Sequence, residues 1–106
     1  MKAAVLGATG YTGQVLLRIL SEHPEVQQIM AASSSQAGTP VRAADPGLPR
    51  DIEAKIPGGL LVTPQDVLNA AARKGGIDVG FSALPHLKSA EICAPLFGKT
   101  VVIDLS

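Results

Sequence analysis

The first thirteen residues, MKAAVLGATGYTG, constrain the fold of this chain more than any other stretch. An apolar, strand-like run at 3–6 leads directly into glycines at positions 7, 10 and 13, and residues 14–21 have apolar side chains at helical spacing. A strand that turns through glycines into a helix presents backbone N–H groups to a phosphate. The stretch therefore predicts a dinucleotide-binding turn.

Each glycine of this turn has its own expected role. Gly7 allows a sharp turn at a backbone angle that side chains disfavour. Gly10 leaves room for a pyrophosphate to approach the positive end of the helix, and Gly13 lets helix and strand pack closely. Threonine hydroxyls add hydrogen-bond donors. The predicted phosphate-binding residues are Gly7, Thr9, Gly10, Tyr11, Thr12 and Gly13.

Composition indicates one globular domain, since 46% of the 106 residues are hydrophobic and 17% are charged. Nine basic and nine acidic residues cancel, which argues against nucleic acid as a partner. A single cysteine fits a reducing compartment, and no apolar stretch approaches the ~20 residues that cross a bilayer. The strand that begins at Lys2 leaves no room for a signal peptide. We therefore expect a cytoplasmic protein that does not bind membranes.

Strands and helices are predicted to alternate along the first half of the chain. Pro24 ends the helix over 14–21, and residues 26–33 read as the second strand. Residues 34–59 contain four of the eight prolines and four glycines. We expect an extended loop there with at most one short strand, around Ile52–Ile56 or Leu60–Val62.

The second half continues the alternation. Thr63-Pro64-Gln65-Asp66 is a helix start, with a threonine cap and proline at the first helical position, and Gly75 suits the helix end. Residues 77–83 form a strand, 88–97 a helix, and 100–105 an almost continuously apolar strand of the kind that is covered on both faces. The pattern predicts one α/β domain over 1–106, a Rossmann-type doubly wound parallel sheet with strand order 3-2-1-4-5 in three α/β/α layers.

The end of the second strand bears on cofactor choice. NAD-selective sites usually place Asp or Glu there to bind the ribose 2′-hydroxyl. This chain instead has Ser33, Ser34 and Ser35, with no acid before Asp45. A carboxylate would repel a 2′-phosphate, whereas hydroxyls can donate to it. The serines therefore favour NADP(H) over NAD(H), with a plain polar loop as the alternative reading.

The end of the fourth strand is expected to lie near the nicotinamide half of the cofactor, through Ala83, Leu84 and Pro85. His86 is suited to acid–base chemistry, but no second titratable group is placed to orient it, so we favour a packing or cofactor-proximal role. Cys93 lies in the middle of the predicted helix without a basic neighbour, which favours a buried structural thiol over a nucleophile. No catalytic or metal-binding residue is predicted.

Five segments, in order along the chain, resemble one enzyme family, the N-acetyl-gamma-glutamyl-phosphate reductases of the aspartate-semialdehyde dehydrogenase superfamily. The resemblance is to the amino-terminal NAD(P)-binding domain of that family. The matching segments are GATGYTG (7–13), HPEV (23–26), ASSSQAGTPV (32–41), FSALPHLKSAE (81–91) and VVIDLS (101–106).

The resemblance implies an oxidoreductase of arginine biosynthesis that uses NADPH to reduce an acyl phosphate to N-acetylglutamate semialdehyde with loss of phosphate. In that family a cysteine thiolate attacks the acyl phosphate and a thioester forms. The cysteine and its histidine partner lie in a carboxyl-terminal catalytic and dimerisation domain, which we expect to be absent from this chain. The chain alone should then be inactive, and its parent a homo-oligomer that binds the small acyl-phosphate substrate through that domain.

The sequence is compatible with other assignments. Many relatives carry Arg in place of Ser35, which weakens the expected 2′-phosphate site. Aspartate-semialdehyde dehydrogenase and aminoadipyl-phosphate reductase are close alternatives, because the second domain selects the substrate. A non-catalytic dinucleotide-sensing module is a further alternative. A short-chain dehydrogenase is unsupported, because Tyr11 is followed four residues later by Val15 and not by lysine.

Overall fold

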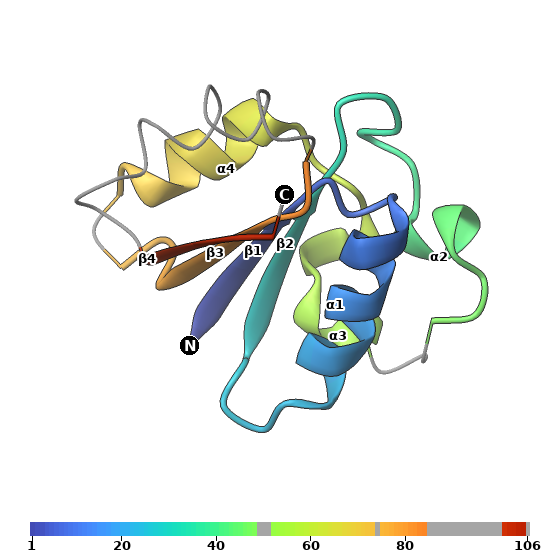
Figure 1. Ribbon diagram of the computed structural model, residues 1–106, viewed down its shortest axis with the longest axis horizontal. Coiled ribbons are helices and arrows are strands. Elements are labelled where there is room, and N and C mark those ends of the chain that lie inside the picture. The colour runs from blue at the N-terminus through green and yellow to red at the C-terminus, as the bar shows by residue number, and fades with distance from the viewer. Residues whose placement is uncertain (49–51, 74, 85–100, 106) are drawn as a thin grey trace.

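The computed structural model describes residues 1–48, 52–73, 75–84 and 101–105 (Figure 1). Among these residues, no helix combines the length and apolar composition that a membrane span requires. Pro85, His86, Cys93 and the helix expected over 88–97 lie outside the described ranges. In chain order the elements are β1 (Lys2–Leu6), α1 (Tyr11–Glu22), β2 (Gln28–Ala32), α2 (Val41–Ala44), α3 (Ile52–Lys55), the 3₁₀ turn η1 (Pro57–Gly59), α4 (Pro64–Ala71), β3 (Val79–Ser82) and β4 (Val101–Asp104).

The described strands form one four-stranded parallel sheet in the order β2-β1-β3-β4. Ala3 of β1 pairs with Ile29 of β2 on one side and with Val79 of β3 on the other. The chain therefore crosses over between β2 and β3 and places β1 in the interior of the sheet. The parallel α/β class predicted from the sequence is confirmed.

The predicted third strand is not formed, and the five-strand order is not confirmed. Ile52–Lys55 is a helix, since Ile52 and Ile56 are four residues apart and both are buried against the core. Leu60 and Val62 make only isolated bridges, to Pro40 and Ala32 respectively. Two consecutive glycines at positive φ (58 and 59) and the start of α4 at residue 64 leave too short an extended segment for a strand.

Helices cover both faces of the sheet, as Figure 1 shows for α1 and α3 on one side and α4 on the other. Successive residues of a strand point to opposite faces, and both faces of β1 and β2 are apolar. Ala3, Val5, Ile29 and Ala31 belong to the core cluster that contains Leu17 of α1 and Ile52 of α3. Ala4, Leu6 and Ala32 belong to the cluster that contains Val67, Ala70 and Ala71 of α4. The three-layer α/β/α arrangement follows from these two cores.

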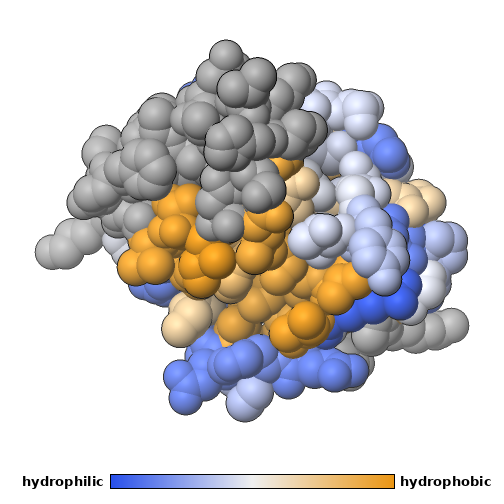
Figure 2. Space-filling model, in the orientation of Figure 1, coloured by the Kyte–Doolittle hydropathy of each residue, from blue (hydrophilic) through white to orange (hydrophobic). Residues whose placement is uncertain are grey.

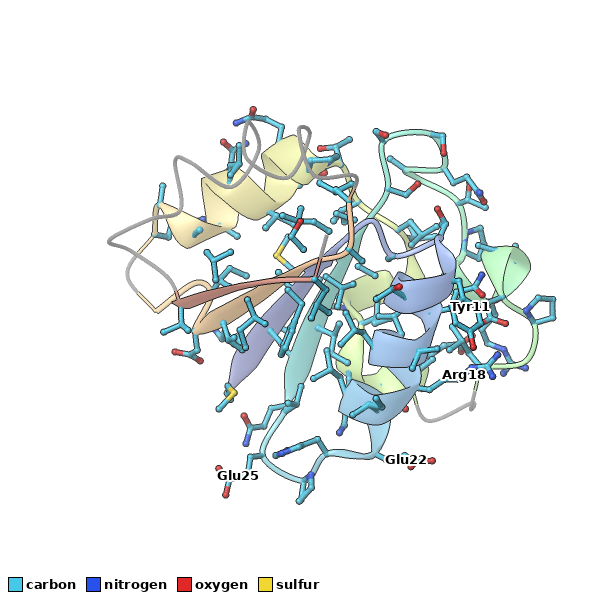
Figure 3. The ribbon with its side chains drawn as sticks, in the orientation of Figure 1. Tyr11, Arg18, Glu22 and Glu25 are labelled. Carbon is cyan, nitrogen blue, oxygen red and sulfur yellow. The ribbon has the colours of Figure 1, made fainter. Side chains whose placement is uncertain are left out.

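Helix α1 is fixed at its carboxyl end by charged side chains. It begins three residues before the predicted range and ends before Pro24, as expected. The Lys55 ammonium donates to the carbonyls of Leu20 at 3.4 Å and His23 at 2.9 Å. Arg18, labelled in Figure 3, pairs with Asp45 at 3.1 Å. These contacts hold the helix against α3 and the segment after α2, and so set the position of its amino end.

We predict that Thr63→Ala lowers the free energy of unfolding by about 1 kcal/mol, the usual loss of a helix cap. The Thr63 hydroxyl accepts from the Asp66 N–H at 3.0 Å, and the Asp66 carboxylate accepts from the Thr63 N–H at 3.0 Å. Urea unfolding measures the change, and Thr63→Ser, which keeps the hydroxyl, is the matched control. Equal stability of the Ala and Ser variants would contradict the capping role.

Candidate functional site

The glycine turn is anchored to the end of β2. The Gly7 and Ala8 N–H groups both donate to the Ala32 carbonyl, at 3.1 and 3.0 Å, and Gly10 N–H donates to the Gly7 carbonyl at 3.2 Å. Gly7 has φ +79°, and a Cβ there would lie 3.1 Å from the backbone carbonyl of Ala83. The sharp-turn role predicted for Gly7 is confirmed.

Gly13 is required by packing. It lies in the first turn of α1, where an added Cβ would overlap the Gly7 carbonyl oxygen and lie 2.8 Å from the Cα of Ala8. The absence of a side chain therefore lets the helix rest directly on the turn that precedes it. Gly13 was expected to let the helix pack closely against the strand. The residues in closest contact with it are those of the turn, Gly7 and Ala8.

Gly10 differs from both. It occupies the N-cap of α1 with φ −75° and ψ 167°, an extended conformation open to any residue. An added Cβ would meet only the Gly7 carbonyl oxygen, at 3.6 Å, which is ordinary van der Waals contact. Within the described residues, neither packing nor backbone strain requires glycine here. An approaching ligand that needs the space above the backbone would explain it.

The amino end of α1 carries no capping side chain and no acidic residue in its first turn. The amino end of α4, in contrast, is closed by Thr63 and Asp66. The first N–H groups of a helix have no intrahelical acceptor and carry the positive end of the helix dipole. Tyr11, labelled in Figure 3, is 83% exposed at this end. The arrangement is suited to an anion.

Hydroxyl groups connect the turn to the serine run. The Thr9 and Ser33 hydroxyl oxygens are 3.4 Å apart, as are those of Ser33 and Ser35. The Gln36 N–H donates to the Ser33 hydroxyl at 3.1 Å, and Ser33 is buried. Ser34 and Ser35 are exposed. The sequence could not separate these roles: Ser33 holds the cluster together, whereas Ser34 and Ser35 are open to solvent.

Ala83 and Leu84, directly after β3, are the third segment of the candidate site. Ala83 N–H donates to the Leu6 carbonyl at 2.9 Å, and the Ala83 backbone abuts Gly7. Residues 7–13, 33–35 and 83–84 thus converge at the carboxyl ends of β1, β2 and β3, where open α/β sheets bind ligands. One contributor was missed in the sequence: the Gln14 side-chain amide donates to the Thr9 carbonyl at 3.3 Å and supports the turn. Nothing in the local pattern identified it.

Two other features do not enter this site. A hollow of about 550 Å³ is lined by Lys2, Gln28 and Arg73 with apolar walls that include Met30 and Leu60. Lys2 and Gln28 begin β1 and β2, so the hollow lies at the amino ends of the strands, opposite the turn. In the part of the chain that the structure describes, no group of three or more His, Cys, Asp or Glu could hold a metal ion.

We predict that Gly13→Ala lowers the free energy of unfolding by about 1–3 kcal/mol, as overpacking usually does. Gly10→Ala is the matched control, because its Cβ makes only an ordinary van der Waals contact, with the Gly7 carbonyl oxygen. It should lose less than about 1 kcal/mol, through the poorer N-cap preference of alanine. Urea unfolding followed by circular dichroism measures both. Equal losses would show that position 10 is also restricted by packing.

A family model matches nearly the whole chain. The model described as semialdehyde dehydrogenase, NAD binding domain, matches residues 2–106.

Curated relatives match over almost all of this chain and a small part of their own. An N-acetyl-gamma-glutamyl-phosphate reductase from Akkermansia muciniphila is 43% identical over 108 positions, covering 100% of this chain and 29% of the relative. The enzyme of that name from Acidothermus cellulolyticus is 38% identical over 104 residues, covering 98% and 27%. A relative from Aeropyrum pernix, named as a LysW-L-2-aminoadipate/LysW-L-glutamate phosphate reductase, is 42% identical over 107 residues, covering 100% and 28%. The chain thus spans little more than a quarter of the length of these relatives.

Among solved structures, the chain is similar to aspartate semialdehyde dehydrogenase with NADP from Candida albicans. The TM-score is 0.73 at 26% sequence identity, over 97% of this chain and 28% of that one.

Proposed function

Since the chain belongs to the semialdehyde dehydrogenase NAD-binding domain family, we propose that residues 1–106 are the NADP(H)-binding domain of an acyl-phosphate reductase. One observation carries the proposal. Gly10 has no side chain at a position where the chain itself would accept one, directly beside an uncapped helix terminus. A pyrophosphate bound at that terminus accounts for both features.

The residues present fit a nicotinamide dinucleotide. The first-turn N–H groups of α1, next to Gly10, would hold the pyrophosphate, and Thr12 in the same turn is exposed. Ser34 and Ser35 would meet the adenine ribose, on a platform fixed by the Thr9–Ser33 contact. Ala83 and Leu84 would flank the nicotinamide half. When bound, the reduced cofactor supplies a hydride, and the role of this chain is to bind and orient it.

NADP(H) is favoured over NAD(H) because no carboxylate belongs to the serine cluster. The first acid after the serines along the chain, Asp45, accepts hydrogen bonds from Arg18 and from the Gly47 N–H. It is therefore engaged with other partners. The similar solved structure from Candida albicans contains NADP, which supports the same preference.

For the whole protein we propose the reduction of N-acetyl-gamma-glutamyl phosphate to the semialdehyde, in arginine biosynthesis. Relatives of that name, 38–43% identical, support it. The Aeropyrum pernix relative supports a second candidate, reduction of an aminoadipyl phosphate, at a comparable 42%. The two substrates share an acyl-phosphate group. The nucleophile and the substrate pocket would belong to the part of the relatives that this chain does not match. The contacts between subunits of the proposed homo-oligomer would belong to the same part. We propose that the whole protein acts in the cytoplasm.

We predict that the chain binds NADPH more tightly than NADH, and that Ser34→Asp removes this preference. The new carboxylate repels the 2′-phosphate, so the affinity for NADPH should fall by at least ~10-fold, about 1.4 kcal/mol, with NADH binding little changed. Isothermal titration calorimetry measures both cofactors, and Ser34→Asn, of similar size without charge, is the matched control. Equal affinities of the parent chain for the two cofactors would refute the preference.

We predict that Gly10→Val weakens NADPH binding by at least ~10-fold, about 1.4 kcal/mol, with the fold retained. The branched side chain would occupy the space reserved for the pyrophosphate. Calorimetry measures the affinity, and circular dichroism and urea unfolding check the fold. Gly10→Ala should give a smaller loss in the same direction. Unchanged affinity in a folded Val variant would place the phosphate elsewhere.

A further inference from the structure

The hollow at the amino ends of β1 and β2 lies on the side of the sheet that α4 covers. Ala4 of β1 and Met30 of β2 belong to the core cluster that packs with α4. Since strand side chains alternate between the two faces, Lys2 and Gln28, two residues earlier, face the same side. The volume of about 550 Å³ lies in the range of small-molecule sites, roughly 300–1,000 Å³.

The walls of the hollow are apolar and its charged groups are all of one sign. The apolar side chains come from β2, from the segment around η1 and from the end of α4, and include Met30, Leu60 and Val62. Leu60 is 43% exposed, so the hollow is open to solvent on that side. Lys2 and Arg73 contribute positive charge, and none of the described residues that line the hollow is acidic. The lining thus combines hydrocarbon with two cations.

Lys2 and Arg73 differ from the other basic residues of the described ranges. Arg18 and Arg42 each pair with a carboxylate, and Lys55 donates to two backbone carbonyls. Among the same residues, the side chains of Lys2 and Arg73 have no ion pair and no hydrogen bond, and both residues are exposed. The two basic side chains that the described protein does not use therefore line one hollow.

The backbone holds both basic residues in place. The Lys2 N–H donates to the Asp78 carboxylate at 2.7 Å, and the Asp78 N–H donates to the Lys2 carbonyl at 2.8 Å. The Arg73 N–H donates to the Ala70 carbonyl at 3.1 Å, and its own carbonyl accepts the Gly76 N–H at 3.0 Å. A Cβ at Gly76 would overlap the Ala70 carbonyl oxygen, so this turn requires glycine. The side chains thus start from fixed points.

We propose that the hollow binds a small amphipathic anion, a carboxylate with a hydrocarbon body. The carboxylate would meet Lys2 and Arg73, since a guanidinium group binds a carboxylate through two parallel hydrogen bonds. The hydrocarbon body would lie against Met30 and Leu60. A wholly polar anion would leave the apolar walls in water, and an uncharged apolar molecule would leave both cations without a partner.

This ligand site is separate from the candidate cofactor site. Lys2 is the first residue of β1, whereas the glycine turn follows Leu6 at the other end of the same strand. The two ligands therefore approach opposite ends of the sheet and can be bound together. The inference goes beyond the proposed function and does not depend on it.

NMR titration of the isotope-labelled 106-residue chain with octanoate tests the inference. We expect saturable shifts of the Leu60, Gly75 and Gly76 amides, and no shift of the Thr12 amide in the candidate cofactor site. Acetate keeps the charge without the hydrocarbon body, and octylammonium keeps the body with the opposite charge. Both should bind at least ~10-fold more weakly than octanoate.

A charge-removing variant identifies the residues that bind the carboxylate. Lys2→Gln combined with Arg73→Gln should weaken octanoate binding by at least ~5-fold, as expected for two exposed charge contacts. Arg42→Gln, which removes a cation away from the hollow, is the matched control and should bind as the parent does. If the double variant fails to fold by circular dichroism, Leu60→Ser replaces it, and should weaken octanoate by at least ~3-fold with acetate unchanged.

A cation near the carboxyl end of a helix also favours the helix, so urea unfolding of the variants accompanies the titrations. A loss of stability with unchanged octanoate affinity would assign Arg73 to the end of α4 and overturn the inference.

Other surfaces could also attract octanoate, and the position of the shifts separates them. In β4, Val101 is 65% exposed and Ile103 41%, and Figure 2 shows a continuous hydrophobic area over the strands. Shifts centred on the β4 amides, or equal binding of octanoate and octylammonium, would overturn the inference. Displacement of octanoate by NADPH would do the same, because it would place the anion at the cofactor site. NADPH affinity without octanoate tests the proposed function separately.

Discussion

The Ala32 carbonyl oxygen, at the end of β2, is the hydrogen-bond acceptor on which the arrangement of the candidate site depends. It receives both the Gly7 and the Ala8 N–H groups, so the turn cannot shift relative to β2 without losing two hydrogen bonds. The next residue, Ser33, then lies within 3.4 Å of Thr9. This attachment brings the start of α1 at Tyr11 and the serine run at Ser33, 22 residues apart in the chain, to one place.

Features set by short-range chemistry could be predicted from the sequence. Gly7 and Gly13 have the expected roles: the positive φ of Gly7 belongs to the turn itself, and a Cβ at Gly13 would meet Gly7 and Ala8 of the same turn. The start of α4 follows from four consecutive residues, Thr63 to Asp66, whose side chains and backbone satisfy one another. The parallel sheet follows from the alternation of apolar strands with helices, which leaves few other ways to bury both sheet faces.

Features set by tertiary contacts could not be predicted. Ile52 and Ile56 fit a strand or a helix equally well by composition, and packing against the core cluster that includes Leu17 selects the helix. The three consecutive serines look equivalent in sequence, yet Ser33 is buried by its position next to Val62, whose carbonyl accepts the Ser33 N–H at 2.9 Å. The exposure of Val101 and Ile103 could likewise not be predicted, because the apolar sequence of this strand is typical of a strand buried on both faces.

The Lys55 contact with the end of α1 has an electrostatic consequence. A helix has two poles, and here the ammonium group at the Leu20 and His23 carbonyls compensates the negative one. The positive pole at Gly10 has no such partner within the helix, because the first turn lacks an acid. The positive charge at this end of the helix is therefore not compensated by a side chain of α1. A bound diphosphate would compensate the positive amino end, so that both ends of the α1 dipole would be compensated only in the complex.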